Sequence, residues 1–266
     1  MTQFFVSGIM ETLGDKFGLN IGCDWDDDSD LCYGVVVTSQ QTVTQFLTKH
    51  RSLYNYLILD DIVDGSSMIR LVRRAVNADL EIDVVINQKD CIPRTTDQPA
   101  ILYHRTDPVS LPRSVELQYV SFDRGYATNT QYATNEGARV QQAVLSLQCD
   151  FILDDATARA LAYDTLYRMW QQGLTVAFEH PDLRIEPSDI VQIVTDQGTF
   201  VIQILSSLIT KEPMDQSGIG RTNQLTGQLL RTRKGVSIAP GQVNSSSSTG
   251  VFHTYITPTI DFVGST

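Results

Sequence analysis

The sequence has few cysteines, few histidines and no long apolar run. Its 266 residues include four histidines and four cysteines, and no two cysteines form a C-x-x-C pair. We therefore expect reduced, mostly buried thiols and no structural zinc site. No apolar run approaches the roughly 20 residues that a membrane-spanning helix needs, so no membrane span is expected. Residues 1–10 contain no lysine or arginine, which argues against a secretory signal. The cysteines are Cys23, Cys32, Cys91 and Cys149.

Basic side chains are also scarce. The chain has 20 basic and 31 acidic residues, a net charge of −11 and a pI near 4.7. Proteins that hold nucleic acid depend on lysine and arginine to neutralise phosphates, so no specific nucleic-acid binding is expected. A hydrophobic fraction of 42% and a charged fraction of 19% are typical of a globular protein. At roughly 150 residues per domain, the length suggests about two domains.

Residues 1–92 are predicted to form an N-terminal α/β domain. Apolar residues recur every fourth position at Phe5, Ile9 and Leu13, which predicts a helix over 2–18. Ser39 is placed to cap a second helix over 40–50. Strands are expected at 33–38, 54–59, 68–73 and 82–87, with a turn at Asp64-Gly65 between the second and the third.

A proline-rich connector, 93–112, precedes a second, β-rich domain over 113–235. Strict alternation predicts a strand over 114–121, whereas the polar run 123–139 is expected to be a long loop. Asp154 suits the cap of a helix over 154–172 that Gly173 ends. An apolar stripe on this helix is predicted to face the core or a subunit interface. The stripe is Ala156, Ala160, Tyr163, Tyr167 and Trp170, with Ala162, Leu166 and Met169 beside it. Further strands are expected at 144–151, 174–179, 189–194, 199–205, 208–211 and 224–231, the third and fourth forming a hairpin. Residues 236–266 form a C-terminal extension joined by a serine-rich linker.

One acidic stretch has the spacing of a calcium loop. Asp24, Asp26, Asp28 and Asp30 occupy positions 1, 3, 5 and 7 of a D-x-D-x-D pattern. An EF-hand loop also needs glycine at position 6 and glutamate at position 12, and this sequence has Ser29 and Val35 there. Without that last carboxylate the oxygen cage is incomplete, so a solvated acidic loop is favoured over a calcium site.

No catalytic, cofactor-binding or metal site is expected elsewhere. The sequence has no G-x-S-x-G elbow and no phosphate-binding loop. The adjacent pairs Asp60-Asp61 and Asp154-Asp155 have the wrong spacing for acid–base catalysis, because neighbouring side chains point apart. The four histidines are far apart and are interpreted as packing or capping residues. They are His50, His104, His180 and His253.

The second segment resembles a known family in the order and wording of its elements. The strand region LPRSVELQYVSFDRGY at 111–126 is followed by the helix DDATARALAYDTLYRMWQQ at 154–172, the strand LTVAFEH at 174–180 and the phrase IEPSDIVQI at 185–193. This order is similar to that of the phage tail protein family that includes the hub of siphophage tails and of gene transfer agents. The family phrase usually reads Glu-Pro-Gly-Asp-Val-Val, so Ser188 stands where glycine is usual and its turn must avoid or tolerate a positive φ. Gly125-Tyr126 stands where Asp-Tyr is common. The order of elements over 33–231 fits the same family.

The resemblance implies an α+β fold with barrel-like β-domains and flanking helices, similar to contractile-phage baseplate hubs. It implies a structural, non-enzymatic homotrimer without cofactors, forming a ring at the tail tip of the virion after assembly in the host cytoplasm. Its partners would be the distal tail protein, the tape measure protein and tip or fibre proteins, and a fibre would be a separate protein because the sequence stops at Thr266. DNA would pass through the ring during ejection, and a share of the acidic residues would line that channel and repel it. The alternatives are a tail-tip cell-wall or glycan hydrolase using Glu179, Glu186 or Asp189, and a glycan-binding module with exposed Tyr and Trp.

Overall fold

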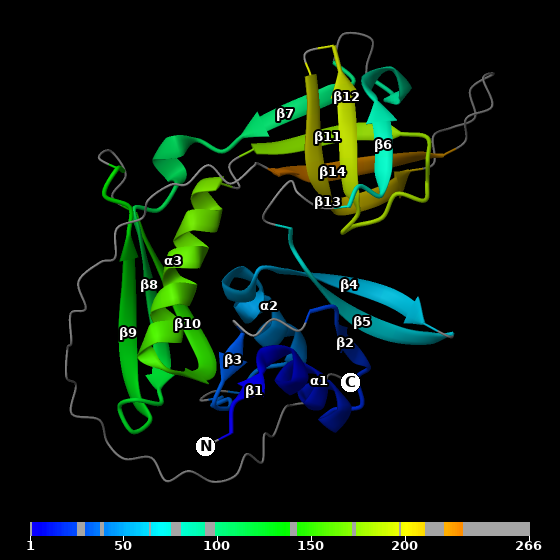
Figure 1. Ribbon diagram of the computed structural model, residues 1–266. Coiled ribbons are helices and arrows are strands. Elements are labelled where there is room, and N and C mark those ends of the chain that lie inside the picture. Colours follow the sequence, from blue (N-terminus) through cyan, green and yellow to red (C-terminus); the bar gives the residue numbers. More distant parts are fainter. Residues whose placement is uncertain are drawn as a thin grey trace. The chain divides into compact units, whose positions relative to one another are not determined.

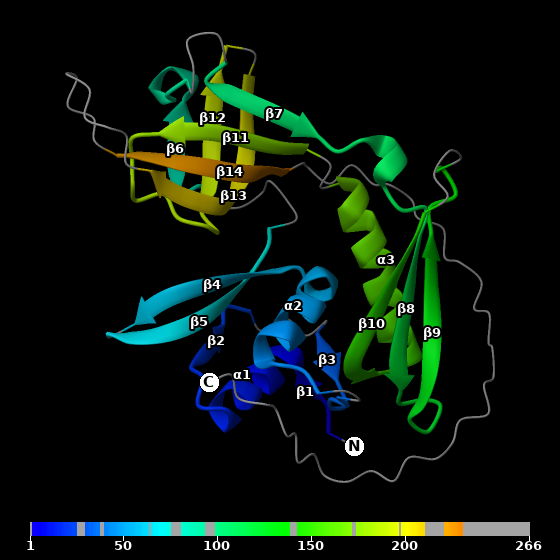
Figure 2. The same cartoon turned by 180° about the vertical axis from the view of Figure 1, so that it is seen from behind.

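The described chain divides into two units that alternate along the sequence (Figures 1 and 2). A computed structural model describes residues 2–25, 30–37, 40–63, 65–75, 81–93, 99–138, 143–171, 174–196, 198–210 and 221–230. Unit 1 contains 1–73 and 112–167, and unit 2 contains 74–111 and 168–236, with 237–266 assigned to unit 1. The predicted division into 1–92, 93–112, 113–235 and 236–266 follows sequence order instead and stays a prediction. Residues 236–266 lie outside the described part of the chain.

The first part of unit 1 packs two helices against a small mixed sheet. Its sheet has the order β2-β5-β4, and a two-stranded pair joins β1 to β3. The predicted first helix and the β4–β5 hairpin are confirmed, and the hairpin strands are longer than expected. The buried side chains of α1 and α2 face the core between these elements. The elements are β1 (Phe4–Phe5), α1 (Val6–Lys16), β2 (Ile21–Cys23), β3 (Leu31–Cys32), α2 (Val43–Tyr54), β4 (Tyr56–Val63) and β5 (Ser66–Arg73).

Two local predictions in this part are wrong. Helix α2 begins at Val43 because Thr42 and Gln45 form a capping box, in which each side chain accepts the backbone N–H of the other residue. Ser39, the predicted cap, lies outside the described residues. Of the predicted strand 33–38, the structure describes residues 33–37. No strand spans these residues, and their pairing is an isolated bridge between Val35 and Phe151. Residues 33–37 therefore form an irregular segment that lies beside the end of β10 (Val144–Leu153).

The second part of unit 1 is a three-stranded sheet with one long helix along a face (Figures 1 and 2). Strand β8 (Ser114–Ser121) is confirmed; it pairs antiparallel with β9 (Ala127–Thr134) and parallel with β10 (Val144–Leu153). The predicted long loop over 123–139 is wrong, because β9 lies inside it. Its alternate polar residues Asn129 and Gln131 are buried against hydrogen-bonding partners, so polarity does not mark it as a loop.

Helix α3 (Asp155–Gln171) begins after Asp154, whose carboxylate accepts the Thr157 N–H at 2.6 Å, so the predicted cap is confirmed. The predicted apolar stripe of α3 is not the face that is buried. Ala156 and Ala160 are exposed, and the buried stripe of the helix is Ala158, Ala162, Thr165 and Leu166. An alanine-rich helix has two apolar faces of similar size, and the sequence alone does not indicate which one packs on the sheet.

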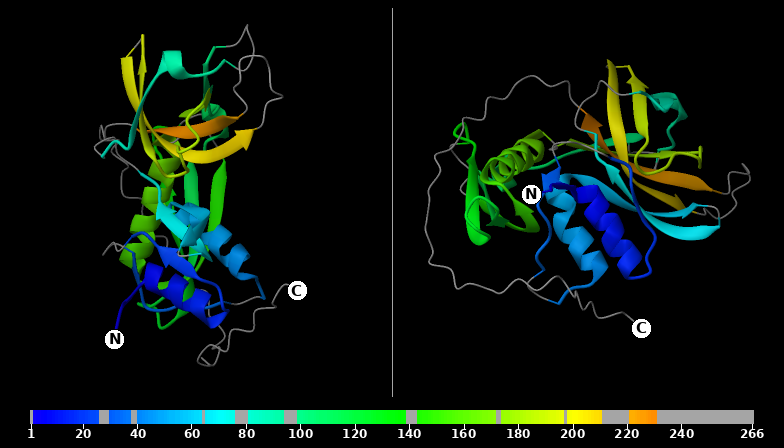
Figure 3. Two further views of the ribbon diagram at one scale, coloured as in Figure 1. Left: turned by 90° about the vertical axis from the view of Figure 1, so that its right-hand side faces the viewer. Right: turned by 60° about the horizontal axis from the view of Figure 1, so that its bottom comes forward.

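Unit 2 is a six-stranded sheet of order β6-β12-β13-β14-β11-β7 whose strands surround one core. All six strands contribute to that core through buried residues such as Ile86, Ile101 and Ile193. The long strand β13 pairs with β12 through its first half and with β14 through most of its length (Figure 3). The strands are β6 (Val84–Asn87), β7 (Ile101–Arg105), β11 (Leu174–His180), β12 (Ile190–Thr195), β13 (Gly198–Thr210) and β14 (Thr222–Leu230), with short 3₁₀ turns η1 (Gln88–Asp90) and η2 (Pro108–Ser110).

The sheet coils but is not closed. Tyr103 of β7 contacts Phe200 of β13 with ring centroids 5.7 Å apart, although two other strands separate β7 from β13 in the sheet. Among the described residues no ladder joins the edge strands β6 and β7. The fold is therefore α+β, as predicted, with an open, coiled sheet where a barrel-like domain was expected.

Strand β7 lies within the predicted proline-rich connector 93–112, whose role as a connector stays a prediction. Pro99 and Pro108 flank the strand and do not interrupt it, and β7 pairs on one side only, with β11. Proline is compatible with such an edge position. No helix in the described part of the chain is long and apolar enough to cross a membrane.

Candidate functional site

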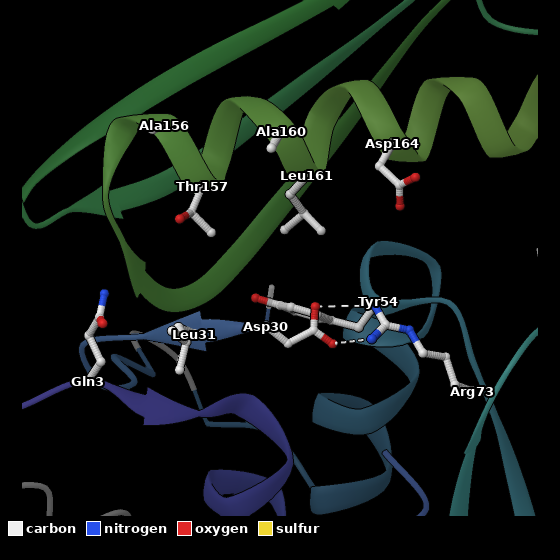
Figure 4. Close-up of a pocket in the computed structure, with 10 residues that line it drawn as sticks. All are labelled: Gln3, Asp30, Leu31, Tyr54, Arg73, Ala156, Thr157, Ala160, Leu161 and Asp164. Atoms are coloured by element: carbon white, nitrogen blue, oxygen red, sulfur yellow. Dashed lines mark hydrogen bonds and ion pairs between the residues drawn. The ribbon is translucent and has the colours of Figure 1, made fainter. Parts of the chain in front are cut away.

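A cavity of about 430 Å³ lies in unit 1 between the outer face of α3 and the β1–β3 region (Figure 4). Five separate segments of the chain supply its walls, so no short motif marks it in the sequence. The polar groups lie mainly on one wall, with Asp30, Tyr54 and Arg73, whereas α3 contributes mostly small and apolar side chains. The lining residues are Gln3, Asp30, Leu31, Tyr54, Arg73, Ala156, Thr157, Ala160, Leu161 and Asp164.

The polar wall of the cavity is an arginine–carboxylate pair. Arg73 Nη1 lies 2.8 Å from Asp30 Oδ2, and Arg73 Nη2 donates to Asp30 Oδ1 at 3.2 Å. Asp30 is 5% exposed, so this two-point contact is largely shielded from water. Bidentate pairing neutralises the carboxylate and fixes β5 to the segment that precedes β3.

The same pair corrects the interpretation of the acidic stretch. Asp30 was expected in a solvated loop, and it is buried against Arg73. Asp24 is exposed and lies 3.8 Å from Arg70. Asp26 and Asp28 lie outside the described residues. In the part of the chain that the structure describes, no three metal-ligating side chains gather, and Asp24 and Asp30 each pair with an arginine.

A polar network joins the start of α3 to strands β8 and β9. Asp155 Oδ1 accepts hydrogen bonds from Tyr119 at 2.5 Å and from Ser121 at 2.6 Å, and Arg124 Nε lies 3.1 Å from Asp155 Oδ2. Asn129 Nδ2 donates to both Tyr119 and Asp155. Partial burial raises the pKa of Asp155, but the hydrogen bonds from Ser121, Tyr119, Arg124 and Asn129 outweigh it and hold the pKa below its usual value. Burial and the bond to Asp155 together raise the pKa of Tyr119 to about 12.

This network explains the Asp154-Asp155 pair without catalysis. One carboxylate caps the helix and the next anchors it to the sheet, which agrees with the prediction that adjacent aspartates do not form a catalytic pair. The sequence indicated only the capping role, because the partners of Asp155 come from β8, β9 and the turn between them.

His50 is fully buried and links α2 to β10. Its Nδ1 lies 2.8 Å from the Phe46 carbonyl oxygen, and its Nε2 lies 3.1 Å from the backbone nitrogen of Asp150. Nδ1–H therefore donates and Nε2 accepts, which is the arrangement of a neutral ring. Burial is the main cause that lowers the pKa of His50 to about 4, opposed by the Phe46 carbonyl and by Asp150. Lys49 Nζ lies 2.6 Å from Asp150 Oδ1 and secures the same contact.

The other predicted candidates are dispersed. His180 is partly buried, which lowers its pKa, and its Nδ1 accepts the Asp182 N–H at 3.1 Å. His104 is exposed on the edge strand β7, and His253 lies outside the described residues. His50 and His180 thus have the predicted packing and capping roles.

The carboxylates proposed for hydrolysis have different environments. Glu179 is 4% exposed within β11, and Glu186 is exposed. Asp189 Oδ2 accepts the Glu186 N–H at 2.9 Å, which is a turn-stabilising contact. Of the Asp60-Asp61 pair, Asp61 lies 3.2 Å from Arg70.

The four cysteines are free, and three of them are buried, as predicted. Burial raises the pKa of Cys32 and Cys91 to about 11 and that of Cys149 to about 12. Such thiols carry almost no thiolate near neutral pH and are poor nucleophiles.

Comparison with known families decides the affiliation of this chain. Residues 36–206 match the model of the family described as "Putative phage tail protein", which covers more than half of the sequence. The chain belongs to this phage tail protein family. The resemblance inferred from the strand 114–121, the helix 154–172 and the phrase 185–193 is thereby confirmed. No curated protein matches the sequence.

Solved structures share the fold of this phage tail protein at low sequence identity. A chain from the virion of a native gene transfer agent particle matches with a TM-score of 0.62 at 16% identity, covering 91% of this chain and 50% of that chain. The tail protein from Neisseria meningitidis MC58 matches with a TM-score of 0.56 at 11% identity, covering 85% of this chain and 67% of that one. The 43 kDa tail protein of prophage MuSo2 from Shewanella oneidensis gives 0.52 at 12% identity, with coverages of 86% and 67%. The phage tail protein thus spans about half the length of the gene transfer agent chain.

The family phrase also explains an unusual backbone conformation. Ser188 has φ of 91°, a value that favours glycine, and its N–H donates to the Ile204 carbonyl at 2.8 Å. The turn therefore tolerates a positive φ at the position where the family usually has glycine.

Proposed function

We propose that this phage tail protein is the hub of a tail tip, assembled as a ring of three copies that joins the end of the tail tube to the tip. The observation that carries this proposal is the structural likeness to a gene transfer agent virion chain, which extends over 91% of this chain and so includes both alternating units. The coiled sheet of unit 2 supports it as well, because its six strands surround one core as the strands of a barrel do, although no ladder among the described residues joins its edge strands.

The partners of the proposed ring follow from its position. The distal tail protein would lie above it, the tape measure protein would end inside it, and tip or fibre proteins would attach below. The residues described carry exposed apolar side chains in both units, among them Ile62 and Val144 in unit 1 and Leu208 in unit 2. Exposed aliphatic groups of this kind suit a protein whose surfaces are covered on assembly.

The acidic charge supports passage of DNA without retention. A net charge of −11 would repel phosphates from the walls of a channel, so DNA would enter and leave without binding. We propose that a share of the acidic residues lines the channel. The structure of the assembled ring tests this directly, and a neutral or basic lumen would contradict it.

Light scattering and negative-stain imaging of the full-length protein test the hub itself. A trimer with a central hole is expected, alone or after addition of the distal tail protein. A protein that stays monomeric under both conditions and clears cell-wall material would instead support the alternative of a tail-tip hydrolase. A monomer that retains glycan without cleaving it would support the glycan-binding module. The hub proposal includes the absence of enzymatic activity. It also has the ring assemble in the host cytoplasm before it is incorporated into the virion.

A further inference from the structure

Two strands of the protein have one side on which no other strand lies. Strand β4 is the last strand of the sheet β2-β5-β4 in unit 1, and β7 is the last strand of the six-stranded sheet in unit 2 (Figure 1). Among the described residues β4 pairs only with β5, and β7 pairs only with β11. Unpaired sides of this kind are where a further strand can join a sheet. We call them the β4 edge and the β7 edge.

The two edges carry charges of opposite sign. The outer half of β4 has the sequence DDIV at 60–63, and β7 ends with the sequence LYHR at 102–105. Asp60 and Arg105 are both exposed. Beside these charges, Ile62 is 76% exposed and Tyr103 is 53% exposed. Each edge therefore presents a charged group and an apolar group two residues apart, acidic on β4 and basic on β7.

The backbone of β4 indicates which of its residues face the free side. The Ile62 N–H donates to Asp61 Oδ1 at 2.8 Å, so a side chain holds this amide in place of a strand. In an antiparallel strand the N–H and C=O groups of one residue point to one side, and those of the next residue point to the other. Ile62 and Asp60 therefore direct their backbone groups to the β4 edge.

The backbone of β7 is oriented in a matching way. Thr175 of β11 lies opposite His104, and its hydroxyl donates to the His104 carbonyl oxygen at 3.3 Å. The carbonyl of His104 therefore points toward β11. By the same alternation, Tyr103 and Arg105 direct their backbone groups to the β7 edge.

One antiparallel register matches the backbone groups and the side chains of both edges. It places Arg105 opposite Asp60 and Tyr103 opposite Ile62, and each of these pairs can exchange two backbone hydrogen bonds. Opposite charges and apolar groups that face each other across a ladder stabilise it. The other pairs of this register are His104 with Asp61 and Leu102 with Val63.

The charges also determine what kind of contact the edges can make. Two β4 edges brought together would oppose Asp60 and Asp61 of one copy with the same carboxylates of the other, and like charges across a ladder destabilise it. A contact between a β4 edge and a β7 edge joins two different surfaces instead. Such a heterologous contact between identical copies generates a ring when the rotation closes.

We propose that β7 of one copy adds to the β4 edge of the next copy as an antiparallel strand, in the register that opposes Arg105 and Asp60. The partner is a second copy of this chain, and this inference rests on the proposed ring of three copies. Three identical contacts close the ring. Each contact covers Ile62 with Tyr103 and pairs backbone groups that no strand pairs in the single chain.

Charge reversal and its rescue test the contact in the full-length protein, under the condition in which the wild type forms its ring. Asp60→Arg and Arg105→Asp each oppose like charges, so each should raise the concentration of half-assembly about threefold to thirtyfold. The double variant restores opposite charges and should assemble within about twofold of the wild type. Glu136→Arg and Arg113→Asp make the same changes of charge at exposed positions outside both strands and should leave assembly unchanged. Circular dichroism of each variant verifies that the fold is retained.

Disulfide trapping identifies the register independently of charge. The background is Cys23→Ser, because Cys23 is the native cysteine that is not buried. Copies with Val63→Cys are mixed with copies carrying Leu102→Cys under mild oxidation. The register makes these residues a non-hydrogen-bonded pair, whose Cα separation of about 4.5 Å suits a disulfide. A crosslinked dimer in the mixture, absent from either variant alone, is the expected result.

The outcomes separate this contact from the hub function. A wild-type ring that tolerates both charge reversals, that the double variant does not restore, or that gives no crosslink would overturn the strand contact and leave the hub function intact. A wild-type protein that never assembles would overturn both.

Discussion

Acidification should unfold unit 1 through His50. The buried ring accepts a backbone N–H at Nε2, and protonation would replace that acceptor with a donor facing another donor. The pKa of His50 is lowered from 6.5 to about 4, so the unfolded chain binds a proton between these values and the folded chain does not. Stability is complete above pH 6.5 and falls as the pH drops toward 4.

The size of the loss follows from the two pKa values. The linkage relation gives a loss of about 2 kcal/mol at pH 5 and about 3 kcal/mol at pH 4, relative to pH 7.5. The groups that face the ring are Asp150, whose Oδ2 lies 3.8 Å from Nε2, and Lys49, which pairs with Asp150. The Phe46 and Phe151 rings cover it, with centroids 4.4 Å and 4.9 Å away, so water does not compensate the new charge.

Urea unfolding at several pH values measures this loss. On a Trp170→Phe background, tryptophan fluorescence follows unit 1, because the remaining Trp25 is buried and stacks on Tyr56 with centroids 5.4 Å apart. His50→Gln removes the titrating group, and its free energy of unfolding should depend less on pH than that of the wild type by the amounts above. His104→Gln, which removes an exposed imidazole, serves as the control. A constant difference between wild type and His50→Gln from pH 7.5 to 5, or an NMR titration of His50 above pH 6, would refute the reasoning.

Four further substitutions test other parts of the structure. Gly14→Ala should destabilise the protein by about 1–3 kcal/mol in thermal unfolding, because its Cβ would lie 2.8 Å from the Leu19 carbonyl oxygen, whereas Gly8→Ala in the same helix meets nothing within 4 Å and should stabilise by up to about 1 kcal/mol. Equal effects at the two glycines would contradict the packing of α1. Ser188→Gly should stabilise by about 1 kcal/mol, because it removes the strain of a φ of 91°; a lower melting temperature would count against that strain. Asp155→Asn should cost about 1–2 kcal/mol at neutral pH, and the difference from wild type should shrink as the pH falls below the ordinary pKa of an aspartate, because the pKa of the native carboxylate is lowered and the unfolded chain takes up the proton first; a pH-independent difference would mean that its charge is not used.

Elements with strong local signals could be predicted from the sequence. Strand β8 and helix α3 have clear periodicity and a clear cap, and both were predicted to within a residue of their observed ends. The hairpin between β12 and β13 was predicted from the turn between its strands. In each of these elements the residues that determine the structure are neighbours in the sequence.

Strands β7 and β9 could not be predicted in this way. Both are defined by long-range pairing, β9 with polar side chains buried in a network and β7 between prolines at the edge of a sheet. The same limit applies to the candidate site. Asp30 was interpreted as solvated because its partner Arg73 is 43 residues away in the chain. The Ser188 turn was the exception, since the departure from the family phrase at one position indicated where to look for a positive φ.

The alternation of the two units along the chain has a consequence for synthesis on the ribosome. The chain passes between the units after residues 73, 111 and 167. When α2 emerges, His50 and Lys49 lack Asp150, which is translated about a hundred residues later. Strand β6 pairs with β12 and strand β7 pairs with β11, so both remain unpaired until those later strands are translated. Unit 1 cannot complete its core before α3 is translated, and unit 2 cannot complete its core before β14 is translated. A nascent chain of this protein therefore exposes unpaired strands of both units until the later segments of each unit have been translated.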